Sequence, residues 1–133
     1  MASKRLHKEY QEILRNPVYL WETYPKECDI FHWFAILTGH PDSRYAGQTF
    51  SAELIFPPDY PFNPPRFQFK THIRHQNVSS EGLLCIDILK KSAGGAWSPA
   101  FTVSKILLSI GSLIFDEITE RPLVRSAPRS LEQ

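Results

Sequence analysis

The chain has 133 residues, long enough to bury a hydrophobic core without cross-links and short enough for a single domain, residues 1–133. Hydrophobic residues make up 42% and charged residues 22%, and the net charge of +1 gives no general attraction to nucleic acid or anionic lipid. Residues 1–5 lack the apolar core of a secretion signal, no apolar run is long enough to span a membrane, and Cys28 and Cys85 do not have metal-ligand spacing. We therefore expect a monomer in the cytoplasm or nucleus, with no metal, no cofactor, and neither a membrane nor nucleic acid as partner.

The first predicted element is a helix over residues 3–15. Four apolar side chains recur at the spacing of one helical face, namely Leu6, Tyr10, Ile13 and Leu14. The opposite face carries charges, from Lys4, Arg5, Lys8 and Glu9. Asn16-Pro17 ends the helix, because the residue before a proline disfavours helical backbone.

Three segments then have the pattern of strands. Residues 31–37 are apolar on both faces, which predicts a central strand, and residues 50–56 alternate between apolar and other side chains. Residues 67–69 alternate in the same way. The turn residues between 39 and 47 make a short connection, which favours an antiparallel meander. In the proline-rich stretch that follows the second strand, the Tyr60–Pro61 bond is a candidate cis peptide.

The stretch from Thr71 to Ala96 has no period, and a helical period returns at Thr102. Six apolar residues then form one stripe, namely Val103, Ile106, Leu107, Ile110, Leu113 and Ile114. We interpret this stripe as core packing in a second long helix. The predicted fold class is α+β.

Cys85 lies in the irregular stretch, after the polar segment 79–82 and near Asn77 and Asp87. A thiol is the best side-chain nucleophile near neutral pH, and an amide and a carboxylate nearby are groups that assist acyl transfer. The alternative for a lone cysteine is a small buried hydrophobe.

Four ordered motifs surround this cysteine. They are Tyr60-Pro61-Phe62-Asn63-Pro64-Pro65, His75-Gln76-Asn77, Gly82-Leu83-Leu84-Cys85-Ile86-Asp87-Ile88-Leu89 and Trp97-Ser98-Pro99-Ala100. The string resembles the active-site stretch of the ubiquitin-conjugating enzymes, and the likeness extends from Lys4 to Val124. The resemblance implies their fold: an N-terminal helix, a four-stranded antiparallel meander, an irregular active-site stretch and a long helix. Two further helices usual in the family would be largely missing, and residues 125–133 are a candidate disordered tail.

The resemblance also implies residue roles. Cys85 would carry the C-terminus of ubiquitin as a thioester and pass it to a ligase cysteine or a substrate lysine. Asn77 would donate to the oxyanion or hold the active-site loop, Asp87 would orient and deprotonate an attacking amine, and His75 would support the loop.

Two positions depart from the family pattern. Gln76 stands where the family has proline, which relaxes the backbone and adds an N–H group. Arg121 stands where an acidic residue usually borders the lysine channel, and Glu120 could replace that acid. We expect Arg121 to weaken unassisted transfer to free lysine, while transfer between thiols, which needs no amine deprotonation, survives.

By the same resemblance, a RING or HECT ligase would bind two loops and the edge of the first helix, through Phe62, Ser98, Pro99, Ala100, Arg5 and Lys8. The ubiquitin-activating enzyme would meet the basic face of that helix. Three alternatives stay open: a non-catalytic binding module of the same fold, a conjugating enzyme for another ubiquitin-like modifier, and an unrelated cysteine hydrolase. The last would need a histidine-based activating pair, which the pattern around His75 does not indicate.

Overall fold

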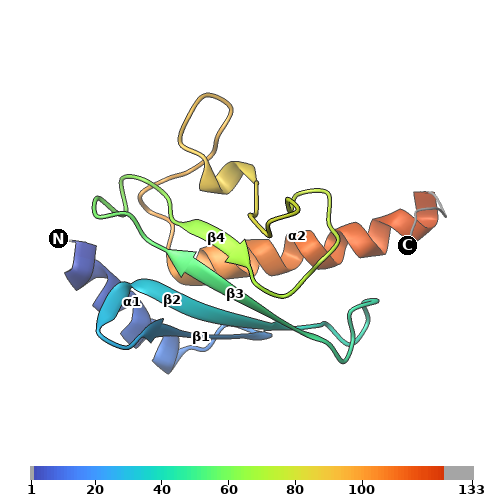
Figure 1. Ribbon diagram of the computed structural model, residues 1–133, viewed down its shortest axis with the longest axis horizontal. Helices are drawn as coiled ribbons and strands as arrows, with labels where there is room; N and C mark the ends of the chain where they lie inside the picture. The colour runs from blue at the N-terminus through green and yellow to red at the C-terminus, as the bar shows by residue number, and fades with distance from the viewer. Residues whose placement is uncertain (1, 125–133) are drawn as a thin grey trace.

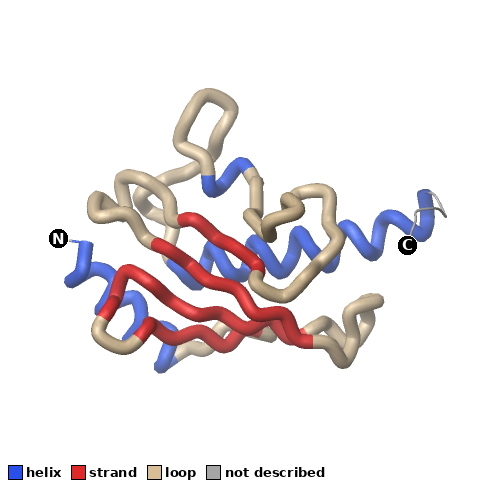
Figure 2. The backbone as a smooth tube through the Cα atoms, in the orientation of Figure 1, coloured by secondary structure: helices blue, strands red, loops and turns tan. Residues whose placement is uncertain are grey.

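The computed structural model of the protein describes residues 2–124, and the side chains of residues 2–115. The elements in order are α1 (Ala2–Arg15), β1 (Trp21–Lys26), β2 (Asp29–Thr38), β3 (Thr49–Ile55), β4 (Arg66–Phe69), the 3-10 turn η1 (Asp87–Leu89) and α2 (Val103–Val124). Figure 1 shows α2 running behind the sheet, with α1 beside β1 and β2. The long loops gather beyond β4, on the side of the molecule where η1 lies (Figure 2).

The four strands form one antiparallel sheet in the order β1-β2-β3-β4, which confirms the predicted meander and the α+β class. Alternate residues of each strand face the helices and are buried, as Trp33, Ala35 and Leu37 are in β2. The facing register pairs Trp33 with Leu54, and Leu54 with Phe67. These side chains form the core together with the buried faces of α1 and α2.

The buried face of α1 differs from the predicted one. Leu6 and Ile13 are buried as expected, but Leu14 is 62% exposed. Glu9, expected on the charged outer face, is only 8% exposed. The prediction was wrong because the Glu9 carboxylate is satisfied partly by Tyr60 and Val103, 51 and 94 positions away, and the helix pattern does not reveal these partners.

The stripe on α2 is confirmed as core, since five of its residues are fully buried: Val103, Ile106, Leu107, Ile110 and Ile114. Leu113 is partly buried and packs against the core. The side chains of Glu120 and Arg121, the predicted tail at 125–133 and the expected loss of the last two helices lie outside the described residues.

The Tyr60–Pro61 peptide bond is cis, as predicted. Within residues 2–124 no helix is long and apolar enough to cross a membrane. The same described residues contain no cluster of histidine, cysteine or carboxylate side chains that could hold a metal ion.

Candidate active site

A short hairpin formed by residues 78–84 leads into Cys85 and lies along the free edge of β4. The Leu84 N–H donates to the Phe67 carbonyl at 3.0 Å, and the Phe69 N–H donates to the Gly82 carbonyl at 2.8 Å. At the turn, Gly82 has a φ of +92°, and a Cβ there would overlap the carbonyl oxygen of Phe69. Glycine is therefore required for the hairpin to approach β4 this closely.

The backbone of Cys85 is fixed against Asn77 by two hydrogen bonds. The Cys85 N–H donates to the Asn77 carbonyl at 2.8 Å, and the Asn77 side-chain Nδ2 donates to the Cys85 carbonyl at 3.4 Å. The thiol itself is exposed, and its Sγ lies 3.9 Å from the carbonyl oxygen of Leu83. The structure thus brings Asn77 against the backbone of Cys85, and Cys85 is not the buried hydrophobe of the alternative interpretation.

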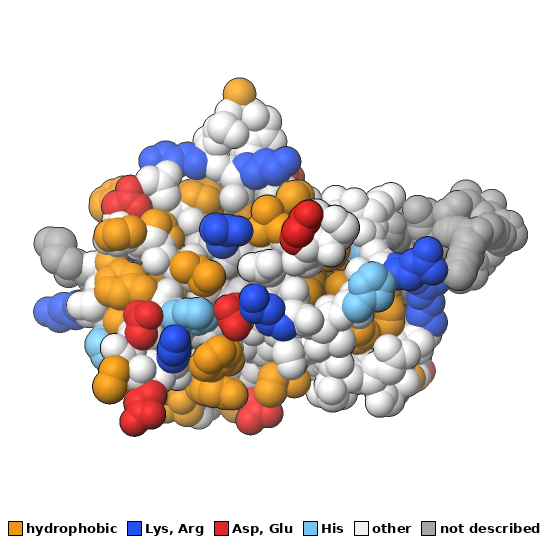
Figure 3. All heavy atoms as spheres, in the orientation of Figure 1, with side chains coloured by type: hydrophobic (Ala, Val, Ile, Leu, Met, Phe, Trp, Pro, Cys, Tyr) orange, Lys and Arg blue, Asp and Glu red, His pale blue; other side chains and the backbone are white. Residues whose placement is uncertain are grey.

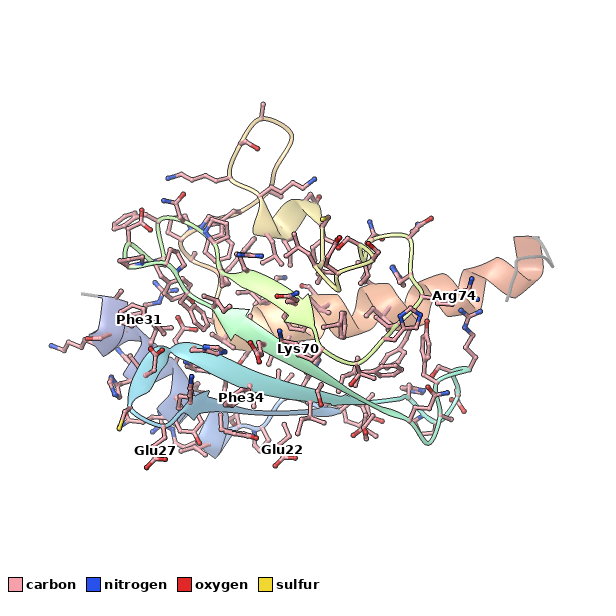
Figure 4. The ribbon with its side chains drawn as sticks, in the orientation of Figure 1. Glu22, Glu27, Phe31, Phe34, Lys70 and Arg74 are labelled. Atoms are coloured by element: carbon pink, nitrogen blue, oxygen red, sulfur yellow. The ribbon has the colours of Figure 1, made fainter. Side chains whose placement is uncertain are left out.

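The loop that presents Asn77 is shaped by His75. The Asn77 N–H donates to the His75 Nδ1 at 3.0 Å, and the Val78 N–H donates to the His75 carbonyl at 3.0 Å. Gln76 is exposed at the tip of this turn. Arg74, labelled in Figure 4, lies where the loop starts, and its carbonyl accepts a hydrogen bond from the Tyr45 hydroxyl at 3.4 Å.

Asp87 lies on the same side of the backbone as Cys85. Ile86 between them is buried and has extended backbone, with φ −135° and ψ 159°. In extended backbone alternate side chains point the same way, so both exposed groups face away from the core. A carboxylate is therefore present on the thiol's side of the chain, where a group that accepts the proton of an attacking amine would have to be.

Beyond η1, residues 90–97 form a loop whose two ends are hydrogen-bonded to each other, and this loop protrudes from the molecule in Figure 3. The Trp97 N–H donates to the Lys90 carbonyl at 3.1 Å, and the Ala96 N–H donates to the Asp87 carbonyl at 2.8 Å. Lys90 and Lys91 are exposed at its base. The base of the loop is thus fixed against Asp87 at the start of η1.

Four of the residues predicted to bind a ligase, Phe62 and Ser98–Ala100, lie in two neighbouring loops, and the other two, Arg5 and Lys8, lie on α1. Phe62 is 63% exposed. Pro99 and Ala100 are also exposed, and the Ser98 Oγ accepts the Ala100 N–H at 3.2 Å. The two loops are joined by the Trp97 indole N–H, which donates to the Pro61 carbonyl at 2.9 Å.

The comparison that decides the family concerns almost the whole chain. The model of the family described as "Ubiquitin-conjugating enzyme" matches residues 5–133. The chain belongs to the ubiquitin-conjugating enzyme family. Its fold is also similar to the structure of human ubiquitin-conjugating enzyme E2 G1, with 36% sequence identity and a TM-score of 0.81 over 86% of this chain and 94% of that one.

The sequence interpretation missed one cluster of this family member, a set of hydrogen bonds around the buried Glu9 carboxylate. The Glu9 Oε2 accepts hydrogen bonds from the Arg5 Nε and from the Tyr60 hydroxyl, both at 2.7 Å, and its Oε1 accepts from the Val103 N–H at 2.6 Å. The Arg5 Nη2 donates to the Phe101 carbonyl at 2.9 Å, and its guanidinium lies 5.5 Å from the centre of the Tyr60 ring. One signal was available, since Glu9 is three residues after Leu6 and four before Ile13, the spacing of the buried face.

The electrostatics of this cluster keep Tyr60 and Arg5 in fixed protonation states. Burial, followed by the negative charge and hydrogen bond of Glu9, raises the pKa of Tyr60 well above its usual range. Burial lowers the pKa of Arg5, but the hydrogen bond and charge of Glu9 outweigh it, so the pKa is raised overall. Tyr60 therefore stays a neutral donor and Arg5 stays a cation. Lys8, on the same helix, is exposed.

Proposed function

We propose that this protein is a ubiquitin-conjugating enzyme, which carries ubiquitin as a thioester on Cys85 and transfers it to a ligase cysteine or a substrate lysine. The observation that carries the proposal is the exposed thiol of Cys85, a residue whose backbone is held by two hydrogen bonds against Asn77 within a chain of this family. An exposed cysteine at this position speaks against a non-catalytic module, which would not need the thiol.

Loading is an exchange of one thioester for another. The Cys85 thiolate attacks the carbonyl carbon of ubiquitin's C-terminal thioester on the activating enzyme. A new carbon–sulfur bond forms, the old one breaks, and the activating enzyme's sulfur leaves as a thiolate. Because Cys85 is exposed, the incoming carbonyl can reach it.

Discharge repeats the attack with a different nucleophile. A thiolate or an amine adds to the thioester carbonyl, and the tetrahedral oxyanion needs a hydrogen-bond donor before the bond to Cys85 breaks. The Asn77 amide can supply one, because Nδ2 carries two hydrogens and the 3.4 Å bond to the Cys85 carbonyl uses only one of them. Asp87 would accept the proton that a lysine ammonium must lose before it attacks.

The test is a charging reaction with ubiquitin, ATP and the activating enzyme. Wild type should give an adduct that thiol reducing agents cleave, Cys85→Ala should give none, and Cys85→Ser should give an ester that resists reducing agents. Cys28→Ser is the matched control, because Cys28 is the other free, exposed cysteine. No adduct from folded wild type would reject the proposal for ubiquitin, and the same reaction with other ubiquitin-like modifiers and their activating enzymes would then decide between another modifier and a binding module.

The partners proposed are the activating enzyme and a RING or HECT ligase, docked on the Phe62 and Ser98–Ala100 loops with Arg5 and Lys8 at the edge. Phe62→Ala should weaken stimulation by a ligase without changing the discharge of the thioester to free cysteine. A ligase that stimulates the variant and wild type equally would place the docking surface elsewhere.

A further inference from the structure

We propose that Glu9 is a positioning residue: its buried carboxylate holds the Phe62 loop and the Ser98–Ala100 loop in the relative arrangement that a ligase binds. The inference deepens the proposed function, because it concerns the ligase-docking loops of that function. Glu9 is far along the chain from both loops and from Cys85, and no motif of the active-site stretch includes it.

The first step in the argument is that one carboxylate joins three separate segments. Its two oxygens accept from Arg5 within α1, from the Tyr60 hydroxyl in the first docking loop, and from the Val103 N–H where α2 begins. A buried carboxylate needs such partners, since burying a charge without a partner is strongly unfavourable. The three segments therefore cannot separate without exposing this carboxylate to solvent or leaving it buried without its partners.

The second step is that the cluster extends directly to the docking residues. Tyr60 is two residues before Phe62, and its ring packs against Trp97, with centroids 6.2 Å apart. Arg5 binds the Phe101 carbonyl, next to Ala100. Each docking loop is thus held from within by one partner of Glu9, while its outward side chains stay exposed.

The third step is the charge at the start of α2. The Val103 N–H is one of the unsatisfied donors at the N-terminus of a helix, where a negative charge is favourable. Glu9 supplies that charge from another helix. It therefore fixes the end of the Ser98–Ala100 loop at the point where the loop becomes α2.

The first experiment measures amide hydrogen exchange by NMR on the whole, uncharged protein, so it needs no ubiquitin and no ligase. The probes are Phe62, Ala100 and Val103, and the reference amides are Leu84 and Cys85 in the active-site hairpin. In Glu9→Gln, exchange at the three probes should rise about tenfold or more, because a hydrogen bond to a charged acceptor is worth more than tenfold in a local equilibrium. The reference amides should change less than about twofold.

Glu12→Gln is the matched control, since it removes the same charge from the same helix. Glu12 is exposed and bonds only Arg15 and Asn16 among the described contacts. It should leave all five amides unchanged. Tyr60→Phe removes only one of the three hydrogen bonds to the Glu9 carboxylate and should raise exchange at Phe62 more than at Val103. This variant keeps the proposal testable if Glu9→Gln fails to fold.

The second experiment measures discharge of preformed ubiquitin thioester. The stimulant is an isolated RING domain chosen because it accelerates discharge from the wild type, and the readout separates its half-maximal concentration from the maximal rate. Glu9→Gln should raise the half-maximal concentration about tenfold and leave discharge to free cysteine, without the RING domain, within about twofold.

Two results would overturn the proposal. Equal acceleration of exchange at the probe and reference amides would mean that Glu9 only supports global stability. Unchanged stimulation in a variant whose loops exchange faster would mean that loop arrangement does not govern ligase binding. Failure of wild type to charge would instead reject the proposed function and leave the exchange result standing.

Discussion

Gly82 provides the sharpest test of how the active-site hairpin is built. In Gly82→Ala, the new methyl group would overlap the Phe69 carbonyl and the residue would keep a φ of +92°. Positive φ costs a non-glycine residue about 1–2 kcal/mol. Relieving the overlap requires the hairpin to move away from β4, which breaks the Phe69–Gly82 and Leu84–Phe67 hydrogen bonds at about 1 kcal/mol each. The expected loss in free energy of unfolding is therefore roughly 3–4 kcal/mol.

The matched control is Gly47→Ala. Gly47 also has positive φ, +83°, but a Cβ there would have nothing within 4 Å. It should lose only the backbone contribution, about 1–2 kcal/mol. The difference between the two variants isolates the close approach of hairpin and strand.

The assay is urea unfolding followed by tryptophan fluorescence, read with equal m-values. In thermal unfolding the Gly82→Ala midpoint should fall by roughly 10–15 °C. Charging of Cys85 at a temperature where the variant is still folded should also be slower than in Gly47→Ala. Equal destabilisation of the two variants would refute the reasoning, because it would show that the hairpin yields without cost.

Three further changes test other parts of the structure. Above a pH of about 10 the unfolded state loses the Tyr60 proton while the folded state keeps it. The free energy of unfolding should therefore fall with pH more steeply in wild type than in Tyr60→Phe, by up to about 1.4 kcal/mol per pH unit. Equal pH dependence of the two proteins in urea unfolding would contradict this. Trp97→Phe leaves the Pro61 carbonyl without its donor and should cost about 1–2 kcal/mol in urea unfolding. Arg121→Asp should raise discharge to free lysine several-fold and leave discharge to free cysteine unchanged, and comparable lysine rates would sink the hypothesis that Arg121 repels the amine.

The sequence pattern predicted the elements with strong periods and missed the weakest strand. The apolar segment at 31–37 became the centre of β2, and the residues of α1 agreed to within one position. β1 was expected only through the family resemblance, because Pro25 interrupts its pattern. The sheet accommodates Pro25 because β1 is an edge strand and its register shifts between Pro25 and Lys26.

The candidate site divides in the same way between local and distant information. Cys85, Asn77 and Asp87 are close in sequence, so motif and spacing were enough to place them together. The spacing of Glu9 from Leu6 and Ile13 places it on the buried face, but its partners Tyr60 and Val103 could not be predicted, because their positions depend on the whole chain. Polar side chains inside a core are therefore where reading a sequence by periodicity fails.

The hydrogen-bonded base of the 90–97 loop has a practical consequence for engineering. Its base is locked by the Trp97–Lys90 and Ala96–Asp87 hydrogen bonds, and Gly94 at its outer part has open space around it. Each doubling of a flexible loop's length costs only about 0.6 kcal/mol. A fluorophore or short epitope grafted between Ser92 and Gly94 would thus lie on a protruding loop whose base is bonded to Asp87, two residues after Cys85, and would leave the hairpin that leads into the thiol unchanged.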